Sequence, residues 1–205
     1  MIRVSFQGER GAYSEGAAIS FFHDKIQTIP CQTFAKVLKN TEDGESDYSI
    51  LPIENSLEGS VGESNDLLLS TNLNAIGEIY YQIEHCLIGK GKIEDIDTVY
   101  SHPQALGQCR QFIQEHLLKP IPSYDTAGSV KIIKELNSKN SACIASKGAA
   151  KIYDVPVIQE GIADKINNYT RFLIFSQKKI DKTKNGKLSL IHISEPTRRY
   201  AIWYA

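Results

Sequence analysis

The sequence contains no long apolar run and no block of like charge. No segment approaches the roughly 20 apolar residues that a membrane-spanning helix needs, and the formal net charge of the 205 residues is only −1. The first residues, MIRVSFQG, enter a strand pattern without the basic and apolar parts of a secretory leader. We therefore expect a cytoplasmic protein that binds neither nucleic acid nor membrane, and any anionic ligand must be held by local groups.

Cysteine is scarce, and the glycine patterns of nucleotide-binding loops are missing. Cys31, Cys86, Cys109 and Cys143 form neither CxxC pairs nor a spacing shared with histidines, so no zinc site is predicted. We expect reduced core thiols. Cys109, which follows His102 in an expected helix, is the one whose reactivity is to be tested. Neither a phosphate-binding loop nor a G-x-G-x-x-G pattern occurs. The sequence therefore predicts no metal and no cofactor.

Short β-branched runs alternate with segments of helical period, which is typical of α/β architecture with largely parallel sheets. The expected strands span residues 2–6, 26–30, 48–52, 76–88, 98–101, 143–145 and 171–175. The expected helices span residues 14–22, 34–40, 61–69, 103–117, 126–136 and 147–153.

The run from 76 to 88 is unusually long for one strand, so we expect it to cross between two lobes. On this interpretation residues 1–76 and 168–180 form the first lobe, residues 77–167 form the second, and residues 181–205 form a linker and tail. His85 lies on an apolar face of this run and is interpreted as a hydrogen-bonded core histidine.

Several turns between a strand and a helix carry small polar residues, at 101–104, 125–129 and 145–150. In an open α/β sheet such helix starts lie at the carboxyl ends of the strands, where their amides and dipoles favour anions. Helix capping alone explains any single turn of this kind. The presence of several such turns in one chain, however, favours a site for a small carboxylate ligand. The segment NNYTRF at 167–172 adds a hydroxyl, a guanidinium and an aromatic ring at the mouth of a strand, enough to bind an anion and protonate it.

Six segments in order resemble the prephenate dehydratase family and cover about residues 2 to 176. They are GERGAYSEGAA (8–18), LPIENSLEG (51–59), HPQALGQ (102–108), DTA (125–127), IASKGAA (144–150) and NNYTRF (167–172). The resemblance implies two α/β lobes, similar to type II periplasmic binding proteins, with the active site in the cleft between them. It also implies a lyase of phenylalanine biosynthesis that converts prephenate to phenylpyruvate without a cofactor, commonly as a homodimer or homotetramer.

The resemblance also implies roles for individual residues. Thr170 is the expected proton donor to the leaving hydroxyl, and Asn55 and Gln104 are the neutral amides expected to orient the reacting groups. Arg171 is expected to bind the retained carboxylate, and Phe172 to shield the leaving carboxylate from water. Further contacts to the pyruvyl carboxylate are expected from Ser14, Ser56, Thr126, Ala127 and Ser146. Arg10 and Lys147 are interpreted first as solvated charges.

The carboxyl end departs from the family pattern. KNGKLSLI at 184–191 is similar to the first strand of the phenylalanine-binding ACT domain, but residues 192–205 continue no family pattern. We interpret them as a truncation or a tail derived from cloning or sequencing adapters, and expect no feedback by phenylalanine. Two alternatives stay open. One is an arogenate dehydratase, which performs the same chemistry on an amino substrate, and the other is a small-carboxylate-binding module without turnover.

Overall fold

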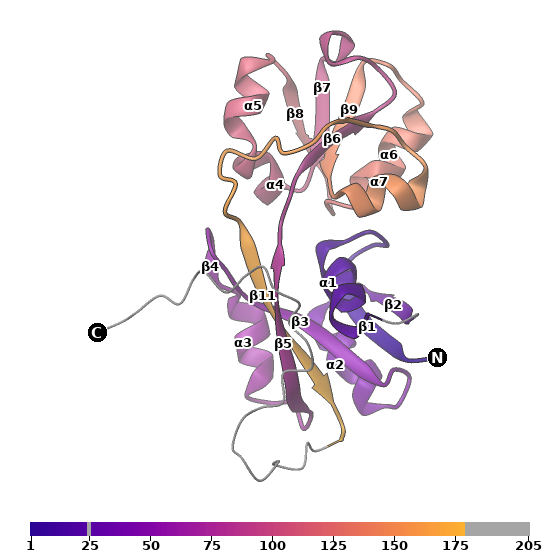
Figure 1. Ribbon diagram of the computed structural model, residues 1–205, viewed down its shortest axis with the longest axis vertical. Helices are drawn as coiled ribbons and strands as arrows, with labels where there is room; N and C mark the ends of the chain where they lie inside the picture. The colour runs from indigo at the N-terminus through magenta and orange to yellow at the C-terminus, as the bar shows by residue number, and fades with distance from the viewer. Residues whose placement is uncertain (24–25, 179–205) are drawn as a thin grey trace, which may run out of the picture.

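The computed structural model describes residues 1–23 and 26–178, which form two lobes, each built on its own sheet (Figure 1). The linker expected at 181–205, with its ACT-like strand and its tail, lies outside the described residues. The two-lobed α/β arrangement that the sequence predicted is confirmed. Among the described residues, no helix has the length and hydropathy needed to cross a membrane.

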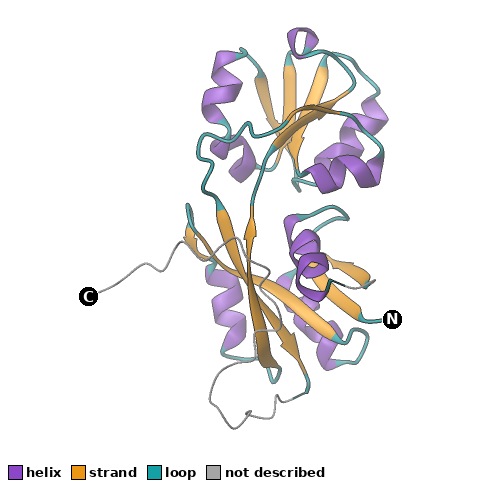
Figure 2. Cartoon of the chain, viewed as in Figure 1, coloured by secondary structure: helices purple, strands orange, loops and turns teal. Residues whose placement is uncertain are grey.

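The first lobe has the strand order β2-β1-β3-β11-β5, with β4 paired to β3. Its strands are β1 (Arg3–Gln7), β2 (Gln27–Cys31), β3 (Tyr48–Asn55), β4 (Gly59–Ser60), β5 (Asn74–Gln82) and β11 (Tyr169–Ser176). Its helices are α1 (Tyr13–Phe22), α2 (Phe34–Glu42) and α3 (Gly62–Leu68). The neighbouring strand residues Ile50 and Leu51 point to opposite faces, Ile50 toward α1 and Leu51 toward α2, so helices cover both faces of the sheet (Figure 2).

The second lobe has the strand order β10-β6-β9-β7-β8. Its strands are β6 (Cys86–Gly89), β7 (Thr98–Ser101), β8 (Lys119–Pro122), β9 (Ser141–Ala145) and β10 (Val157–Gln159). Its helices are the short η1 (Ile93–Asp95), α4 (Pro103–Gln108), α5 (Arg110–Glu115), α6 (Gly128–Leu136) and α7 (Lys147–Tyr153). Ile144 of β9 packs toward α5, whereas its neighbour Cys143 packs toward α6 and α7, so this sheet is also buried on both faces.

The structure corrects several expectations about the helices and strands. The run at 76–88 is two strands, β5 and β6, which belong to different sheets and are joined by residues 83–85, so the lobe boundary lies there and not after Ile76. The helix expected at 103–117 is broken at Cys109, whose φ of −120° and ψ of 26° are not helical. The strands β4, β8 and β10 were not expected, because they are very short or contain proline.

The sheets are mixed, whereas largely parallel sheets were expected. β11 runs antiparallel to both β3 and β5, and β6 runs antiparallel to both β9 and β10. The reason is the double crossing between the lobes. β5 leaves the first lobe and β11 returns to it beside β5, so the two must run in opposite directions (Figure 1).

The two crossing segments are hydrogen-bonded to each other. The amide of Ile83 donates to the carbonyl of Asn168 at 2.8 Å, and the amide of Ile162 donates to the carbonyl of His85 at 3.1 Å. The return segment therefore holds the outgoing one in register, and Ile83 and His85 of the outgoing segment face the space between the lobes.

Ile144→Ala should lower the free energy of unfolding by about 2–5 kcal/mol, because the side chain is fully buried in the second lobe and its loss leaves a cavity. Ile166→Ala is the matched control, since Ile166 is 81% exposed and its change should stay within about 0.5 kcal/mol. Urea titration of both variants and the wild type measures the difference. Equal losses in the two variants would contradict the described core.

Candidate active site in the cleft between the lobes

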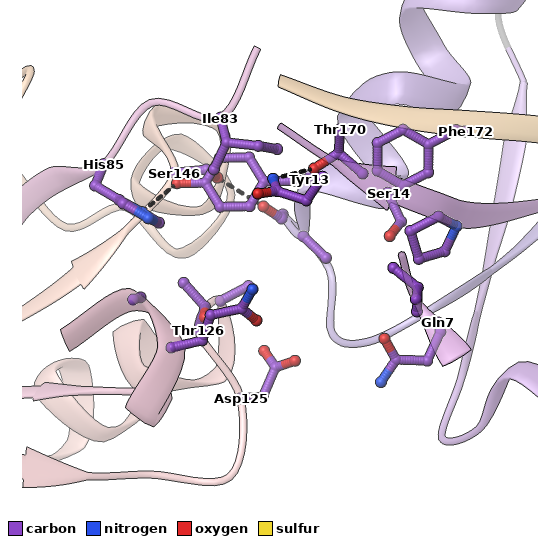
Figure 3. A pocket seen from close by; sticks show the side chains of 18 of the residues that line it. Gln7, Tyr13, Ser14, Ile83, His85, Asp125, Thr126, Ser146, Thr170 and Phe172 are labelled. Carbon is purple, nitrogen blue, oxygen red and sulfur yellow. Dashed lines mark hydrogen bonds between the residues drawn. The ribbon is translucent and has the colours of Figure 1, made fainter. Parts of the chain in front are cut away.

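A cavity of about 250 Å³ lies between the lobes and is lined by both of them (Figure 3). The first lobe contributes the start of α1, the ends of β1 and β3, and the start of β11. The second contributes α4 and the helix starts at 125–127 and 146. Ile83 and His85 of the outgoing crossing segment form part of the wall. The cavity therefore collects the polar turns that the sequence singled out.

Eight of the ten residues expected at the site line this cavity. They are Thr170, Asn55, Gln104, Phe172, Ser14, Thr126, Ala127 and Ser146. The structure does not bring Arg171 or Ser56 to it.

Thr170 lies at the floor of the cavity, where β11 pairs with β3 and β5. Its hydroxyl oxygen accepts a hydrogen bond from Nδ2 of Asn55 at 2.9 Å, and both residues are only 7% exposed. The oxygen of the Asn55 amide accepts from the backbone amides of Leu57 at 2.9 Å and Glu58 at 3.1 Å. Asn55 can therefore only donate to Thr170, and the hydroxyl proton of Thr170 stays available to a ligand.

Arg171 lies on the opposite face of β11. Because side chains alternate along a strand, Thr170 and Phe172 face the cavity and Arg171 faces away from it. Its Nε and Nη2 contact Oε2 of Glu78 on β5 at 2.9 and 2.7 Å. The expectation that Arg171 reaches a ligand carboxylate in the cleft is thus at odds with its position, and its partner is a carboxylate of the protein.

Ser56 holds the ends of two strands together. Its hydroxyl accepts from the backbone amide of Tyr169 at 2.9 Å and donates to the carbonyl of Asn167 at 3.2 Å. Ser56 is exposed outside the cavity, so its contacts fix the start of β11 and not a ligand.

Among residues 1–23 and 26–178, those that line the cavity include no lysine and no arginine. Arg10 pairs with the buried Glu15 at 2.8 Å, and Lys147 pairs with Glu160 at 2.6 Å. The start of α1 lines the cavity, and its N-cap residue Ala12 offers no side-chain cap to the first amides, which carry a partial positive charge. An anion can bind there through backbone N–H groups.

The comparisons with known proteins agree with this geometry. The family model described as "Prephenate dehydratase" matches residues 4–180. The chain belongs to the prephenate dehydratase family. A relative from Arabidopsis thaliana, "Arogenate dehydratase/prephenate dehydratase 2, chloroplastic", is 40% identical over 87% of this chain and 47% of its own length. The chain spans about half the length of the curated relatives it matches.

Two solved structures share the fold of this dehydratase-family chain, each with a TM-score of 0.80 over 87% of it. One is a prephenate dehydratase from Arthrobacter aurescens in complex with L-Phe, 27% identical and covered over 61% of its length. The other, 34% identical and covered over 65% of its length, is described as GqqA, a novel type of quorum quenching acylase.

Sequence reasoning missed several polar residues of this dehydratase-family cleft. Gln108 lies one helical turn after Gln104 in the segment HPQALGQ, and the spacing of four residues predicts a shared helix face. Asn168 directly precedes the start of β11 and accepts from Nδ2 of Asn55 at 2.8 Å. Tyr13 and Asp125 also line the cavity, and both lie inside segments that carried the resemblance. Gln108, and not Gln104, is the α4 amide that joins the contacts around Thr170.

The titratable groups of the cleft have shifted pKa values. Burial raises the pKa of the Asp125 carboxyl, against the hydrogen bond that Oδ1 accepts from the amide of Gly128 at 2.6 Å. Burial lowers the pKa of His85, against the hydrogen bond with Gln108 that favours the charged ring. Both groups are therefore biased toward their neutral forms.

The pH dependence of stability should carry the signature of His85. The unfolded histidine takes up a proton near a pH of about 6.5, whereas the folded histidine resists protonation, so stability is lost as the pH falls through that value. The loss can reach at most about 1.4 kcal/mol per pH unit. The free energy of unfolding of wild type and of His85→Gln is measured with urea at about pH 7.5 and about pH 5.5. Between these two values the wild type should lose more stability than the variant. If the difference in free energy of unfolding between the two proteins were the same at both pH values, the lowered pKa of His85 would be contradicted.

The cysteines should be unreactive in the folded protein. All four are buried and free, and burial raises the pKa of Cys86 to about 11 and shifts the pKa of Cys109 upward as well. Iodoacetamide at about pH 8 should label urea-unfolded protein at four thiols and the folded protein only very slowly. The variant Cys109→Ala has three thiols, so the label that it lacks in comparison with the wild type is the label on Cys109. Rapid labelling of native Cys109 would make it a candidate nucleophile after all.

Proposed function

We propose that this chain converts prephenate to phenylpyruvate, carbon dioxide and water. In this reaction the bond between the ring and its carboxylate breaks, and that electron pair moves through the ring and expels the hydroxyl group. The departing oxygen takes a proton and leaves as water, so the reaction takes up one proton overall. Electrons balance without an oxidant or a reductant, and the absence of a cofactor stays a prediction from the sequence.

The observation that carries this proposal is the hydrogen bond from Asn55 to Thr170. Since the hydroxyl oxygen of Thr170 accepts from Asn55, its own proton is directed to another acceptor, and the leaving hydroxyl of prephenate is such an acceptor. A threonine hydroxyl is a weak acid in water. Held in a buried cleft, it acts mainly on the charge that develops on the leaving oxygen in the transition state.

Binding of a substrate with two carboxylates follows from the arrangement of amides. The first turn of α1 lies on one side of the cavity, and Thr126, Ala127 and Ser146 lie on the other. Backbone N–H groups at the start of α1 and the hydroxyl of Thr126 can hold the pyruvyl carboxylate without a cationic side chain. The Ser146 hydroxyl donates to the carbonyl of Gly11 at 2.6 Å and so joins the two lobes instead. Phe172 and Pro52 supply an apolar wall on the first-lobe side, which disfavours water around the carboxylate that leaves.

Arogenate is the second candidate substrate, because it carries an ammonium group where prephenate carries a keto oxygen. The position of Asp125 favours arogenate, since among the described residues its carboxyl is the one acidic side chain that lines the cavity. An ammonium group beside Asp125 would stabilise its charged form against the effect of burial. Relative rates on the two substrates distinguish these candidates.

The surroundings of Thr170 favour proton donation over nucleophilic attack. An acylase-type nucleophile needs an adjacent base that removes its proton. The partner of the Thr170 oxygen is instead an amide N–H, which can only donate. The contacts of Thr170 therefore support proton donation and not the acyl transfer of the acylase neighbour. A cytoplasmic location and a homodimer or homotetramer stay predictions from the sequence.

Thr170→Val should lower kcat for phenylpyruvate formation from prephenate by about 10² to 10⁴, because the proton donor is lost while the shape of the side chain is kept. Thr170→Ser is the control, since it keeps the hydroxyl and should retain at least about a tenth of kcat. Product formation is followed with prephenate and, separately, with arogenate. Full activity of Thr170→Val would remove Thr170 from the mechanism, and a wild type without turnover on either substrate would favour a binding module.

A further inference from the structure

The cleft contains a continuous line of hydrogen-bonded side chains that the proposed reaction does not explain. It runs from Thr170 through Asn55 and Asn168 to Gln108 and ends at His85. After the bond from Asn55 to Asn168, Nδ2 of Asn168 donates to Oε1 of Gln108 at 3.0 Å. The same oxygen lies 2.8 Å from Nε2 of His85. We call these five residues the amide line.

The hydrogen bonds of the Asn55 amide determine which group donates and which accepts in every bond of the amide line. Two backbone amides donate to the oxygen of Asn55, so its nitrogen must donate to both Thr170 and Asn168. Asn168 accepts with its oxygen and therefore donates with its nitrogen to Gln108. Gln108 in turn presents its oxygen to the line, and its nitrogen donates to Oε1 of Glu58 at 3.0 Å.

These directions fix the tautomer of His85. Because Gln108 presents an oxygen, Nε2 of His85 must carry a proton and donate it. In the neutral ring Nδ1 is then an acceptor, and the hydroxyl of Tyr13 lies 2.8 Å from it. The carbonyl of Glu84 also lies 2.8 Å from the Tyr13 hydroxyl, and the single proton of that hydroxyl is shared between this carbonyl and Nδ1 of His85. Both ring nitrogens of His85 have defined partners.

We infer that His85 is a positioning residue for Thr170 and acts through the three amides of the line. An amide does not readily pass a proton on, so the line orients the Thr170 hydroxyl and does not conduct protons to it. His85 holds the oxygen of Gln108 toward Asn168, Asn168 holds the nitrogen of Asn55, and Asn55 holds the oxygen of Thr170. This inference rests on the proposed function, in which Thr170 is the proton donor.

Burial explains why His85 matters although Glu58 also binds Gln108. His85 is 2% exposed and Asn168 is fully buried, so water does not compete for these bonds. Glu58 is exposed, and its bond to Gln108 is weakened by solvent. The line also joins both lobes, since Gln108 belongs to α4 and Asn55 and Thr170 belong to the first sheet. The orientation of Thr170 therefore depends on the second lobe.

Two substitutions of His85 separate positioning from packing. The side-chain nitrogen of glutamine can take the place of Nε2 and donate to Gln108, whereas that of asparagine takes the place of Nδ1 and faces Tyr13. His85→Gln should keep kcat for phenylpyruvate formation within about threefold of wild type, and His85→Asn should lower it roughly tenfold, with KM changed by less than about twofold in both. Urea midpoints of the two variants, measured at the same pH, show whether either loses folded protein.

A measurement on the wild type does not depend on any variant. The ¹⁵N chemical shifts of the His85 ring, assigned by their loss in His85→Gln, should report a proton on Nε2 and none on Nδ1 at neutral pH. A proton on Nδ1 alone would overturn the inference. Equal kcat values for His85→Gln and His85→Asn would also overturn it while leaving the proposed function intact, as judged from wild-type turnover and Thr170→Val. A wild type without turnover would overturn both.

Discussion

The structure depends on the return of one strand, β11, between β3 and β5 of the first sheet. β11 enters the first sheet directly from the second lobe and pairs with β5, the strand that leads out to that lobe. The two crossing segments therefore lie side by side. The pairing of β11 also sets which side chains of NNYTRF reach the cleft. With Thr170 opposite Asn55 in the register, the hydroxyl and the amide meet at the floor of the cavity. Shifting the register by one residue would put Arg171 there instead.

The cleft offers hydrogen-bond donors to an anion in a way that composition could not indicate. Within the part of the chain that the structure describes, no lysine or arginine lines it, and the nearby Arg10, Lys147 and Arg171 are all paired with carboxylates of the protein. Backbone amides at the uncapped start of α1 face the cavity instead. Such groups are fixed by the fold and keep the same partial charge at every pH.

Long elements were predictable, and junctions were not. The helices α1, α2, α6 and α7 and the strands β1, β2, β7 and β9 lie within a few residues of their predicted ranges, because apolar spacing reports local structure directly. The run at 76–88 was misread because β5 and β6 continue each other in hydrophobic pattern although they belong to different sheets. The break at Cys109 and the strand β8, with its two prolines, left no clear periodic signal.

The sequence by itself determined the family, the two-lobed α/β class and eight of the residues that line the cleft, since ordered motifs and helix-start chemistry are local properties of the chain. Only the tertiary structure decided that Arg171 faces away, that Ser56 ties two strands together, and that His85 contacts Gln108 and Gln108 contacts Asn168. The physical reason is that strand register and hydrogen-bond direction depend on partners far apart in the chain. Asn55 and Thr170 are separated by more than a hundred residues, and their contact exists only once both crossings are made.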